Sequence, residues 1–142
     1  MSKQFDTISP RSMSKEHLLF ANKIIIKRSQ IHRWGVFARE KISKYEIIEE
    51  SPYFFIPSEE MKLSPSSLPY SYDLYDNFII GMGNSGLYNH SFNPNVEYEI
   101  DKVNEVMRHY AIKEINVGEE LTLNYGEENA KNFGEETQIN KE

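Results

Sequence analysis

Two short stretches in the C-terminal half of the chain decide its fold: Asn89-His90-Ser91-Phe92-Asn93-Pro94-Asn95 and Gly118-Glu119-Glu120-Leu121-Thr122-Leu123-Asn124-Tyr125-Gly126. The first combines small amides with a proline, a composition typical of a loop. The second begins at a glycine turn, continues as a short strand over Leu121–Leu123 and ends at a tyrosine. Between them, Val96–Ile100 and Val106–Ile112 alternate apolar and polar residues around a turn, which predicts a β-hairpin.

More short strands are predicted toward the N-terminus. Ile24-Ile25-Ile26 and Val36-Phe37-Ala38 flank a polar turn and predict a second hairpin. Ile47-Ile48 begins a third strand, and Tyr53-Phe54-Phe55-Ile56 forms a fourth. Because the strands are short and numerous while helix signals are weak, we expect a mainly β domain of several hairpins and small sheets.

The middle of the chain has a different composition. Three prolines and a serine cluster predict a loop over residues 57–77. Within and beyond it, Ser71–Ile80 is compatible with a short helix or with irregular structure. We therefore expect a short irregular or helical insert at about residues 57–80.

The domain is expected to span residues 21–128. Residues 1–20 are polar and predict a flexible arm, either loose throughout or with a short helix near Lys15–Phe20. Residues 129–142 form an acidic, polar tail.

Length and composition limit the function. A chain of 142 residues is one domain, and the absence of cysteine excludes disulfides, thiolate catalysis and cysteine zinc sites. No apolar run approaches a membrane span, and no signal-peptide pattern starts the chain. We expect a cytoplasmic or nuclear protein that is not secreted through a signal peptide.

The formal net charge is −6. An acidic surface repels nucleic acid and membrane lipid and favours basic partners, so we expect a basic protein or peptide partner, no direct nucleic-acid contact and no membrane contact. Solubility alone is an equally good reason for a charge of this size.

Gly35 and His90 each have an ordinary explanation beside a functional one. Gly35 follows a polar turn at a strand start, where a ligand can approach the backbone closely, or where the turn simply requires glycine. Ser91 next to His90 does not make a hydrolase, because adjacent side chains rarely reach one reacting atom. The four histidines lack metal-ligand spacing, so no metal site is expected: His17, His32, His90 and His109.

The two quoted stretches resemble the motifs of SET-domain protein-lysine methyltransferases, above all the minimal single-domain type of viruses and bacteria. The resemblance covers roughly Ile24 to Gly126. It implies the β-clip SET fold, in which the C-terminal segment threads beneath a loop in a pseudoknot-like crossing. Such crossings are rare among proteins.

The resemblance also implies a site. Tyr125 matches the family's catalytic tyrosine, and S-adenosyl-L-methionine is the implied cofactor. Its implied binding residues are Arg33, Trp34, Gly35, Asn89 and His90. The chain departs from the family pattern twice here, because Arg33 replaces a glycine and Asn124 replaces an aspartate.

An aromatic channel for the substrate lysine is implied as well. Its candidate walls are Trp34, Tyr88, Tyr70, Tyr72 and Phe133, with Tyr75 as a further candidate in the insert. Aromatic faces favour a cationic amine through cation–π contact. The peptide is expected to add as a strand beside Gly81–Leu87.

The end of the chain departs from the minimal relatives, because Asn129-Ala130 replaces aromatic residues that help to close their site. Either Phe133 or a second subunit is expected to close it here, and a homodimer is compatible with this.

The implied function is methyl transfer to a lysine amine of a protein, with a histone tail as a common target of the family. The alternative is an inactive SET-fold interaction module, which Arg33 and the missing aromatics motivate. Tyr125, Asn89 and His90 favour the enzyme. Some other function on a β-rich fold is the third possibility.

Overall fold

The structure is a computed structural model that describes residues 15–63, 71–74 and 76–126. Its strands form two sheets. The four-stranded sheet has the order β1 (Ile24–Arg28), β2 (Trp34–Ala38), β9 (Glu120–Leu123) and β6 (Asn89–His90). The five-stranded sheet has the order β4 (Tyr72–Leu74), β5 (Asn77–Gly81), β3 (Ile47–Ile56), β8 (Val106–Ala111) and β7 (Val96–Asp101).

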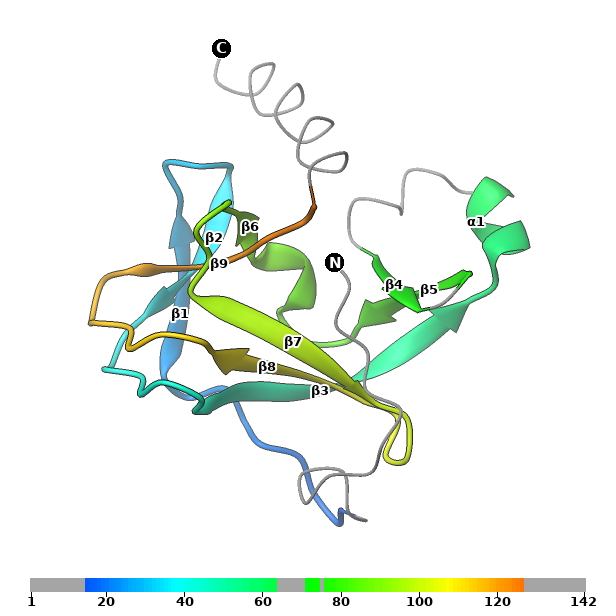
Figure 1. Cartoon of the computed structure of the whole chain (residues 1–142), viewed down its shortest axis with the longest axis horizontal. Helices are drawn as coiled ribbons and strands as arrows, with labels where there is room; N and C mark the ends of the chain where they lie inside the picture. The colour runs from blue at the N-terminus through cyan, green and yellow to red at the C-terminus, as the bar shows by residue number, and fades with distance from the viewer. Residues whose placement is uncertain (1–14, 64–70, 75, 127–142) are drawn as a thin grey trace.

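The helical content is small, and the expectation of a mainly β fold with small sheets is confirmed. One α-helix, α1 (Ser58–Leu63), and one 3-10 turn, Ser85–Leu87, are present in the described part of the chain. In Figure 1 the strands β3, β8 and β7 cross the middle of the molecule, with β1 and β2 at one end and α1 at the other. None of the helices in the described ranges is long and apolar enough to cross a membrane.

Both predicted hairpins are confirmed. β1 pairs with β2, with Ile26 opposite Val36, and β7 pairs with β8, with Tyr98 opposite His109. Their alternating apolar residues face the core, where Val36 is fully buried and Tyr98 is 2% exposed.

The prediction of separate third and fourth strands is wrong, because β3 runs unbroken from Ile47 to Ile56. Pro52 suggests a break, since proline cannot donate to a sheet ladder. In the structure β3 changes neighbours at this point: Ile47–Pro52 pairs with β8 and Tyr53–Ile56 pairs with β5. The carbonyl of Pro52 still accepts a hydrogen bond from the Met82 N–H at 2.8 Å.

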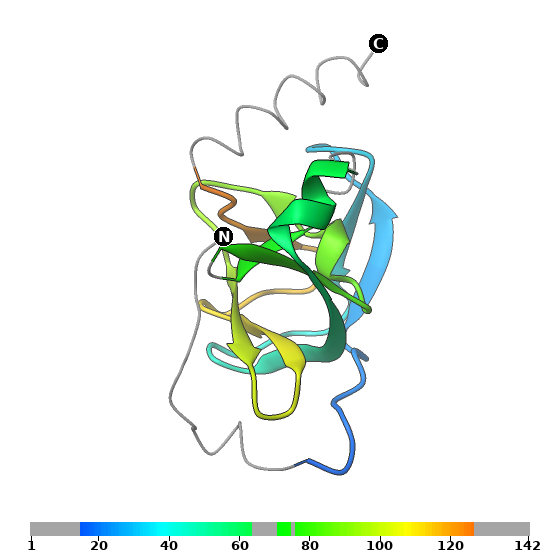
Figure 2. The ribbon, with the colours of Figure 1, turned by 90° about the vertical axis from the view of Figure 1, so that its right-hand side faces the viewer.

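The insert contains regular structure in a different place from that predicted. The described residues of the range 71–80 hold most of the β4–β5 hairpin, with Tyr72 opposite Ile79, and contain no helix. The short helix α1 comes earlier, directly after Pro57, whose carbonyl accepts the first helical hydrogen bonds. Figure 2 shows α1 and the β4–β5 hairpin on one side of the molecule.

Residues 15–20 are not helical, so the suggestion of a short helix there is wrong. The segment lies against the larger sheet instead, because the Leu19 N–H donates to the Glu50 carboxylate at 2.9 Å and Lys15 pairs with Glu50 at 3.2 Å. Residues 1–14 and the tail from residue 127 lie outside the described residues.

The larger sheet carries a buried charged cluster. Arg108 is fully buried and forms ion pairs with Glu50, Glu99 and Asp101 at 2.8, 2.9 and 3.1 Å. Met107 and His109 lie on either side of Arg108 in β8 and point to the opposite face of the sheet, into the apolar core.

Candidate active site

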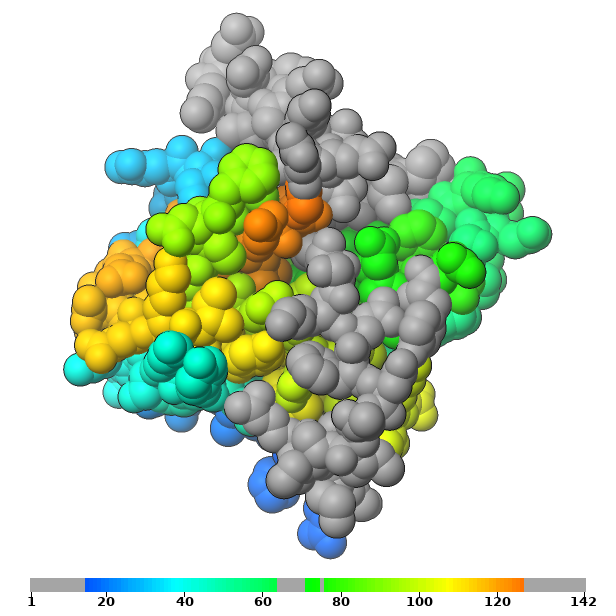
Figure 3. Space-filling model, in the orientation of Figure 1, coloured from blue at the N-terminus to red at the C-terminus, as the bar shows by residue number. Residues whose placement is uncertain are grey.

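The site is organised by a crossing of two segments that are distant in sequence. β6 pairs with β9 in parallel, with Asn89 opposite Thr122 and His90 opposite Leu123. The Ser91 N–H then donates to the Leu123 carbonyl at 2.9 Å. Figure 3 shows the orange segment that ends at Gly126 next to the yellow-green segment that leads into β7.

Asn95 fixes the register of this crossing. Its side-chain amide donates to the Glu120 carbonyl at 2.9 Å, and its side-chain oxygen accepts from the Thr122 N–H at 2.8 Å. One side chain therefore satisfies two backbone groups of β9, as a neighbouring strand would do. This explains why an amide is needed at the end of the first motif.

Tyr125 follows β9 and is 8% exposed. Its hydroxyl donates to the backbone carbonyl of Tyr88, and its N–H donates to His90 Nδ1 at 3.0 Å. Burial, and to a lesser extent the charge of Glu120, raises the pKa of the Tyr125 phenol. The phenol is therefore protonated at neutral pH.

His90 holds Tyr125 and keeps one nitrogen unused. Because Nδ1 accepts from Tyr125, the ring is neutral with its proton on Nε2, which agrees with a pKa lowered by burial. Nε2 is buried and has no hydrogen-bond partner within residues 15–63, 71–74 and 76–126. The ring also contacts Phe92 edge-on at 4.3 Å between centroids, so a free donor lies beside an exposed aromatic ring.

Asn89 ties the first motif to the crossing. Its side-chain amide donates to the carbonyls of His32 and Trp34 at 3.1 and 3.2 Å and to the Glu120 carboxylate at 2.7 Å. The Ser29 hydroxyl donates to the same carboxylate at 2.7 Å. The β1–β2 turn is thereby held against β6 and β9.

The close approach at Gly35 comes from the chain itself. A Cβ at this position would lie 2.3 Å from Glu120 Oε2 and 3.1 Å from Asn89 Nδ2. Gly35 is therefore needed so that Glu120 and Asn89 can reach the turn.

Arg33 occupies a left-handed conformation, with φ of 41°. Glycine adopts this region without strain, so the chain carries local strain where the resemblance expects glycine. Its carbonyl accepts from the Ser29 N–H at 2.8 Å, which closes the turn. Next to it, Trp34 is 46% exposed and carries the Arg28 guanidinium 4.4 Å above its ring.

Two of the tyrosines expected to line the lysine channel are almost completely buried, which is deeper than expected for the walls of a channel open to the surface. Tyr72 and Tyr88 are 2% and 1% exposed. Tyr72 nevertheless lies near enough to Tyr125 that an ionised Tyr125 would add to the effect of burial in raising the pKa of the Tyr72 phenol. Three further candidates, Tyr70, Tyr75 and Phe133, and the departure at Asn129-Ala130 lie outside the described residues.

The sequence alone did not indicate Glu120, Tyr98 or His109. Tyr98 contacts Tyr72 edge-on at 4.6 Å, and its buried hydroxyl has no hydrogen-bond partner in the part of the chain that the structure describes. His109 stacks on Tyr88 at 4.5 Å. Tyr98 and His109 are opposite each other in the β7–β8 hairpin, and only the fold brings them beside the insert.

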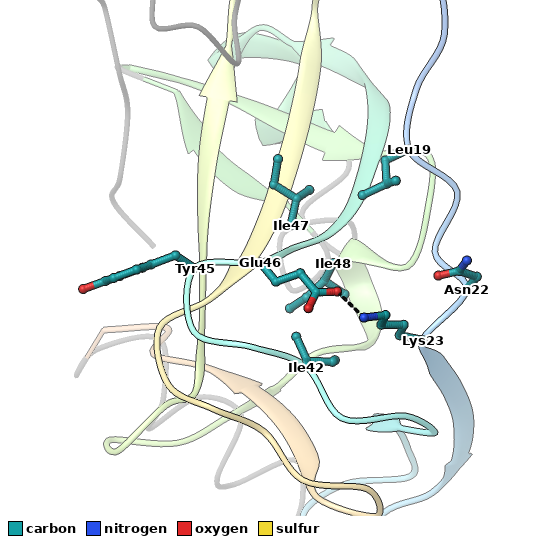
Figure 4. Close-up of a pocket in the computed structure, with 8 residues that line it drawn as sticks. All are labelled: Leu19, Asn22, Lys23, Ile42, Tyr45, Glu46, Ile47 and Ile48. Atoms are coloured by element: carbon teal, nitrogen blue, oxygen red, sulfur yellow. Dashed lines mark ion pairs between the residues drawn. The ribbon is translucent and has the colours of Figure 1, made fainter.

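Two cavities accompany these residues. One of about 270 Å³ includes the chain neighbours of Tyr125 but not Tyr125 itself, and is lined by Pro94, Val96, Glu97, Tyr98, Leu123, Asn124 and Gly126. The other, of about 450 Å³, lies between residues 19–23 and 42–48, where Lys23 pairs with Glu46 at 2.7 Å (Figure 4). Neither cavity is lined by a predicted site residue.

The comparisons with known proteins agree with this geometry. The sequence matches the SET domain family over residues 33–126, well over half of the chain. The chain belongs to the SET-domain family. A search of curated protein sequences gives no match.

The structural neighbours are SET-domain histone methyltransferases. A candidate histone methyltransferase of Plasmodium falciparum has 37% sequence identity and a TM-score of 0.66, over 73% of this chain and 93% of that chain. The Chaetomium thermophilum Polycomb Repressive Complex 2 with H3K27me3 and H3K27M has 26% identity and a TM-score of 0.64, over 76% of this chain. The chain spans 15% of that second structure's length.

Proposed function

We propose that this protein transfers a methyl group from S-adenosyl-L-methionine to the side-chain amine of a lysine in a protein substrate. The observation that carries the proposal is the crossing itself, which places the Tyr125 phenol against Tyr88 and joins Asn89, His90 and Gly35 in one connected cluster. Family membership and the methyltransferase neighbours support this proposal.

Tyr125 acts as an orienting group. Its pKa is raised, so it is not a general base at neutral pH. Its hydrogen is given to the Tyr88 carbonyl, so toward the substrate amine the phenol oxygen can act only as an acceptor of an N–H hydrogen bond. Alignment of the amine accounts for much of the rate enhancement in a displacement of this kind.

The residues present fit the cofactor. The unpaired Nε2–H of His90 is a buried donor that a bound group can satisfy, and Phe92 and Trp34 offer exposed rings nearby. Arg28 and Arg33 supply positive charge for a carboxylate near the same turn. When bound, the cofactor supplies an activated methyl group and a positive sulfonium that lowers the pKa of a nearby amine.

The sheet edge to which a substrate peptide can add differs from the one predicted. Gly81 belongs to β5, which has β4 on one side and β3 on the other, so this part of the predicted edge is occupied. Among the described strands β4 is an edge, and Tyr72 projects from it toward the core near Tyr125. We therefore place the substrate along Tyr72–Leu74 as an added strand.

The substrate is a lysine-rich, basic segment such as a histone tail. Asp73 is exposed on β4, and the net charge of −6 favours such a partner. The H3K27me3 and H3K27M in the structure of the Polycomb neighbour are compatible with this class.

Calorimetry with S-adenosyl-L-methionine tests the proposal, with S-adenosylhomocysteine in parallel. We expect saturable binding near one site per chain, retained in Tyr125→Phe and in the control Tyr53→Phe. With histone peptides, Tyr125→Phe should lose most transfer and Tyr53→Phe little. Folded protein that binds neither ligand at millimolar concentration would favour the inactive interaction module.

A further inference from the structure

A buried polar group stands behind the tyrosines of the site. His109, in β8, is fully buried and contacts three tyrosines, which come from β4, β7 and the segment before β6. Its ring stacks on Tyr88 with an interplanar angle of 4°, its Nε2 lies 3.1 Å from the Tyr72 hydroxyl, and its centroid is 6.2 Å from that of Tyr98. One side chain therefore touches three rings near Tyr125.

The hydrogen-bond pattern fixes the tautomer of His109. The single hydroxyl hydrogen of Tyr72 goes to the Ser85 carbonyl at 2.7 Å, so His109 Nε2 must carry a proton and donate it to the Tyr72 oxygen. Burial lowers the pKa of His109 to about 3, which keeps the ring neutral. Nδ1 is then an unprotonated acceptor that has no hydrogen-bond partner among the described residues.

Nδ1 faces a second buried group, the Glu49 carboxylate, at 3.8 Å. Glu49 accepts from the Asn84 N–H at 3.2 Å and from the Asn84 side-chain amide at 2.7 Å. The Tyr88 phenol lies close to the same carboxylate without meeting hydrogen-bond geometry. Glu49 and Asn84 thus close the far side of the space around His109 and Tyr88.

This arrangement of a buried imidazole lowers the stability of the folded protein. A buried imidazole with an unused nitrogen loses hydration without full compensation, whereas an apolar side chain of similar size would not. Packing alone therefore does not account for the imidazole. The His109 imidazole donates a fixed hydrogen bond to Tyr72 and presents a flat face to Tyr88, and an apolar side chain cannot do both.

We propose that His109, backed by Glu49, is a positioning residue that sets the rings of Tyr72 and Tyr88 and thereby the space beside the Tyr125 phenol. The proposal rests on the proposed methyl transfer. Tyr88 is the direct link, because its carbonyl receives the Tyr125 hydroxyl while its ring lies flat on His109. Tyr72 is the second link, since its phenol is held by His109 and lies near Tyr125.

The test compares His109→Leu, His109→Gln and the control Met107→Leu, which is fully buried on the same strand. His109→Leu should keep cofactor affinity within about twofold and the melting temperature within about 4 °C, yet lower kcat at least tenfold with a smaller change in KM. His109→Gln, whose amide can donate to Tyr72, should recover part of kcat. Met107→Leu should keep wild-type kcat.

A wild-type kcat in His109→Leu would overturn the proposal. So would a parallel loss of cofactor binding, melting temperature and kcat, because that is the pattern of a purely structural residue.

A second measurement does not depend on turnover. In protein with carbon-13-labelled tyrosines, His109→Leu should shift the ring signals of Tyr72 and Tyr88, and Met107→Leu should not. Unchanged signals in His109→Leu would refute the positioning role. If wild-type protein transfers no methyl group while the signals shift as expected, the proposed function fails and the positioning of the rings stands.

Discussion

Neutralising Glu49 and Glu50 should change stability with opposite pH dependence, although they are neighbours in β3. Glu49 is opposite His109 and Glu50 is opposite Arg108, so their carboxylates point to opposite faces of the sheet. Burial raises the pKa of Glu49 above the ordinary 4.5, and the Asn84 hydrogen bonds offset this only in part. Burial acts the same way on Glu50, but hydrogen bonds from Leu19, Arg108 and Lys15 outweigh it and lower the pKa.

The sign of each pH dependence follows from whether the folded or the unfolded state binds the proton of the carboxyl group more tightly. The stability that Glu50 contributes is present above the unfolded pKa and is lost as the pH falls through its lower folded value. The stability that Glu49 contributes is complete below the unfolded pKa and is lost as the pH rises through its higher folded value.

The loss expected at Glu50 follows from its ion pair. Breaking a buried ion pair costs about 3–5 kcal/mol, but in Glu50→Gln the Arg108 guanidinium keeps Glu99 and Asp101. We expect Glu50→Gln to lose about 2 kcal/mol at pH 7, or about 7 °C in melting temperature, and progressively less as the pH falls. For Glu49→Gln we expect the stability difference from wild type to move in the stabilising direction between pH 4 and pH 8.

Urea unfolding followed by far-ultraviolet circular dichroism at four pH values from 3.5 to 8 measures both effects. The wild-type protein at each pH is the reference, so global charge effects cancel in the differences. If the two variants show the same sign of pH dependence, the assignment of buried environments to Glu49 and Glu50 is wrong.

Three other substitutions test the crossing and the β1–β2 turn. Arg33→Gly should raise the unfolding free energy by up to about 1 kcal/mol in urea titrations, because φ is 41° there; a loss would show that the side chain outweighs the strain. Asn95→Ala should lower it by about 2–4 kcal/mol in the same assay, since two backbone groups of β9 lose their partner; a change under about 0.5 kcal/mol would contradict the clamp. Gly35→Ala should weaken cofactor binding at least tenfold in calorimetry by displacing Glu120 and Asn89, and unchanged affinity would separate this turn from the cofactor site.

Local patterns predicted much of the fold. The β1–β2 and β7–β8 hairpins follow from alternation around short polar turns, and both are present. β3 was missed as one strand because Pro52 has no N–H, and no sequence pattern shows that a strand changes neighbours there. The β4–β5 hairpin was missed because β4 has only three residues, too few to display a period.

The site was predictable where a motif carries it and not where tertiary contacts make it. Tyr125, Asn89 and His90 stand in contiguous motifs, and the crossing brings them together. Glu120 lies within a quoted motif, but only the fold brings its carboxylate over Gly35. In the sequence His109 is indistinguishable from an ordinary strand residue, because its three tyrosine contacts come from other segments of the chain.

The central claim is methyl transfer at Tyr125. The most direct measurement is mass spectrometry of lysine-bearing histone peptides incubated with S-adenosyl-L-methionine and wild-type protein, Tyr125→Phe or Tyr53→Phe. The account predicts a lysine that gains methyl groups with wild-type protein and Tyr53→Phe, and at least about a hundredfold less with Tyr125→Phe. Equal methylation by wild-type protein and Tyr125→Phe would contradict it.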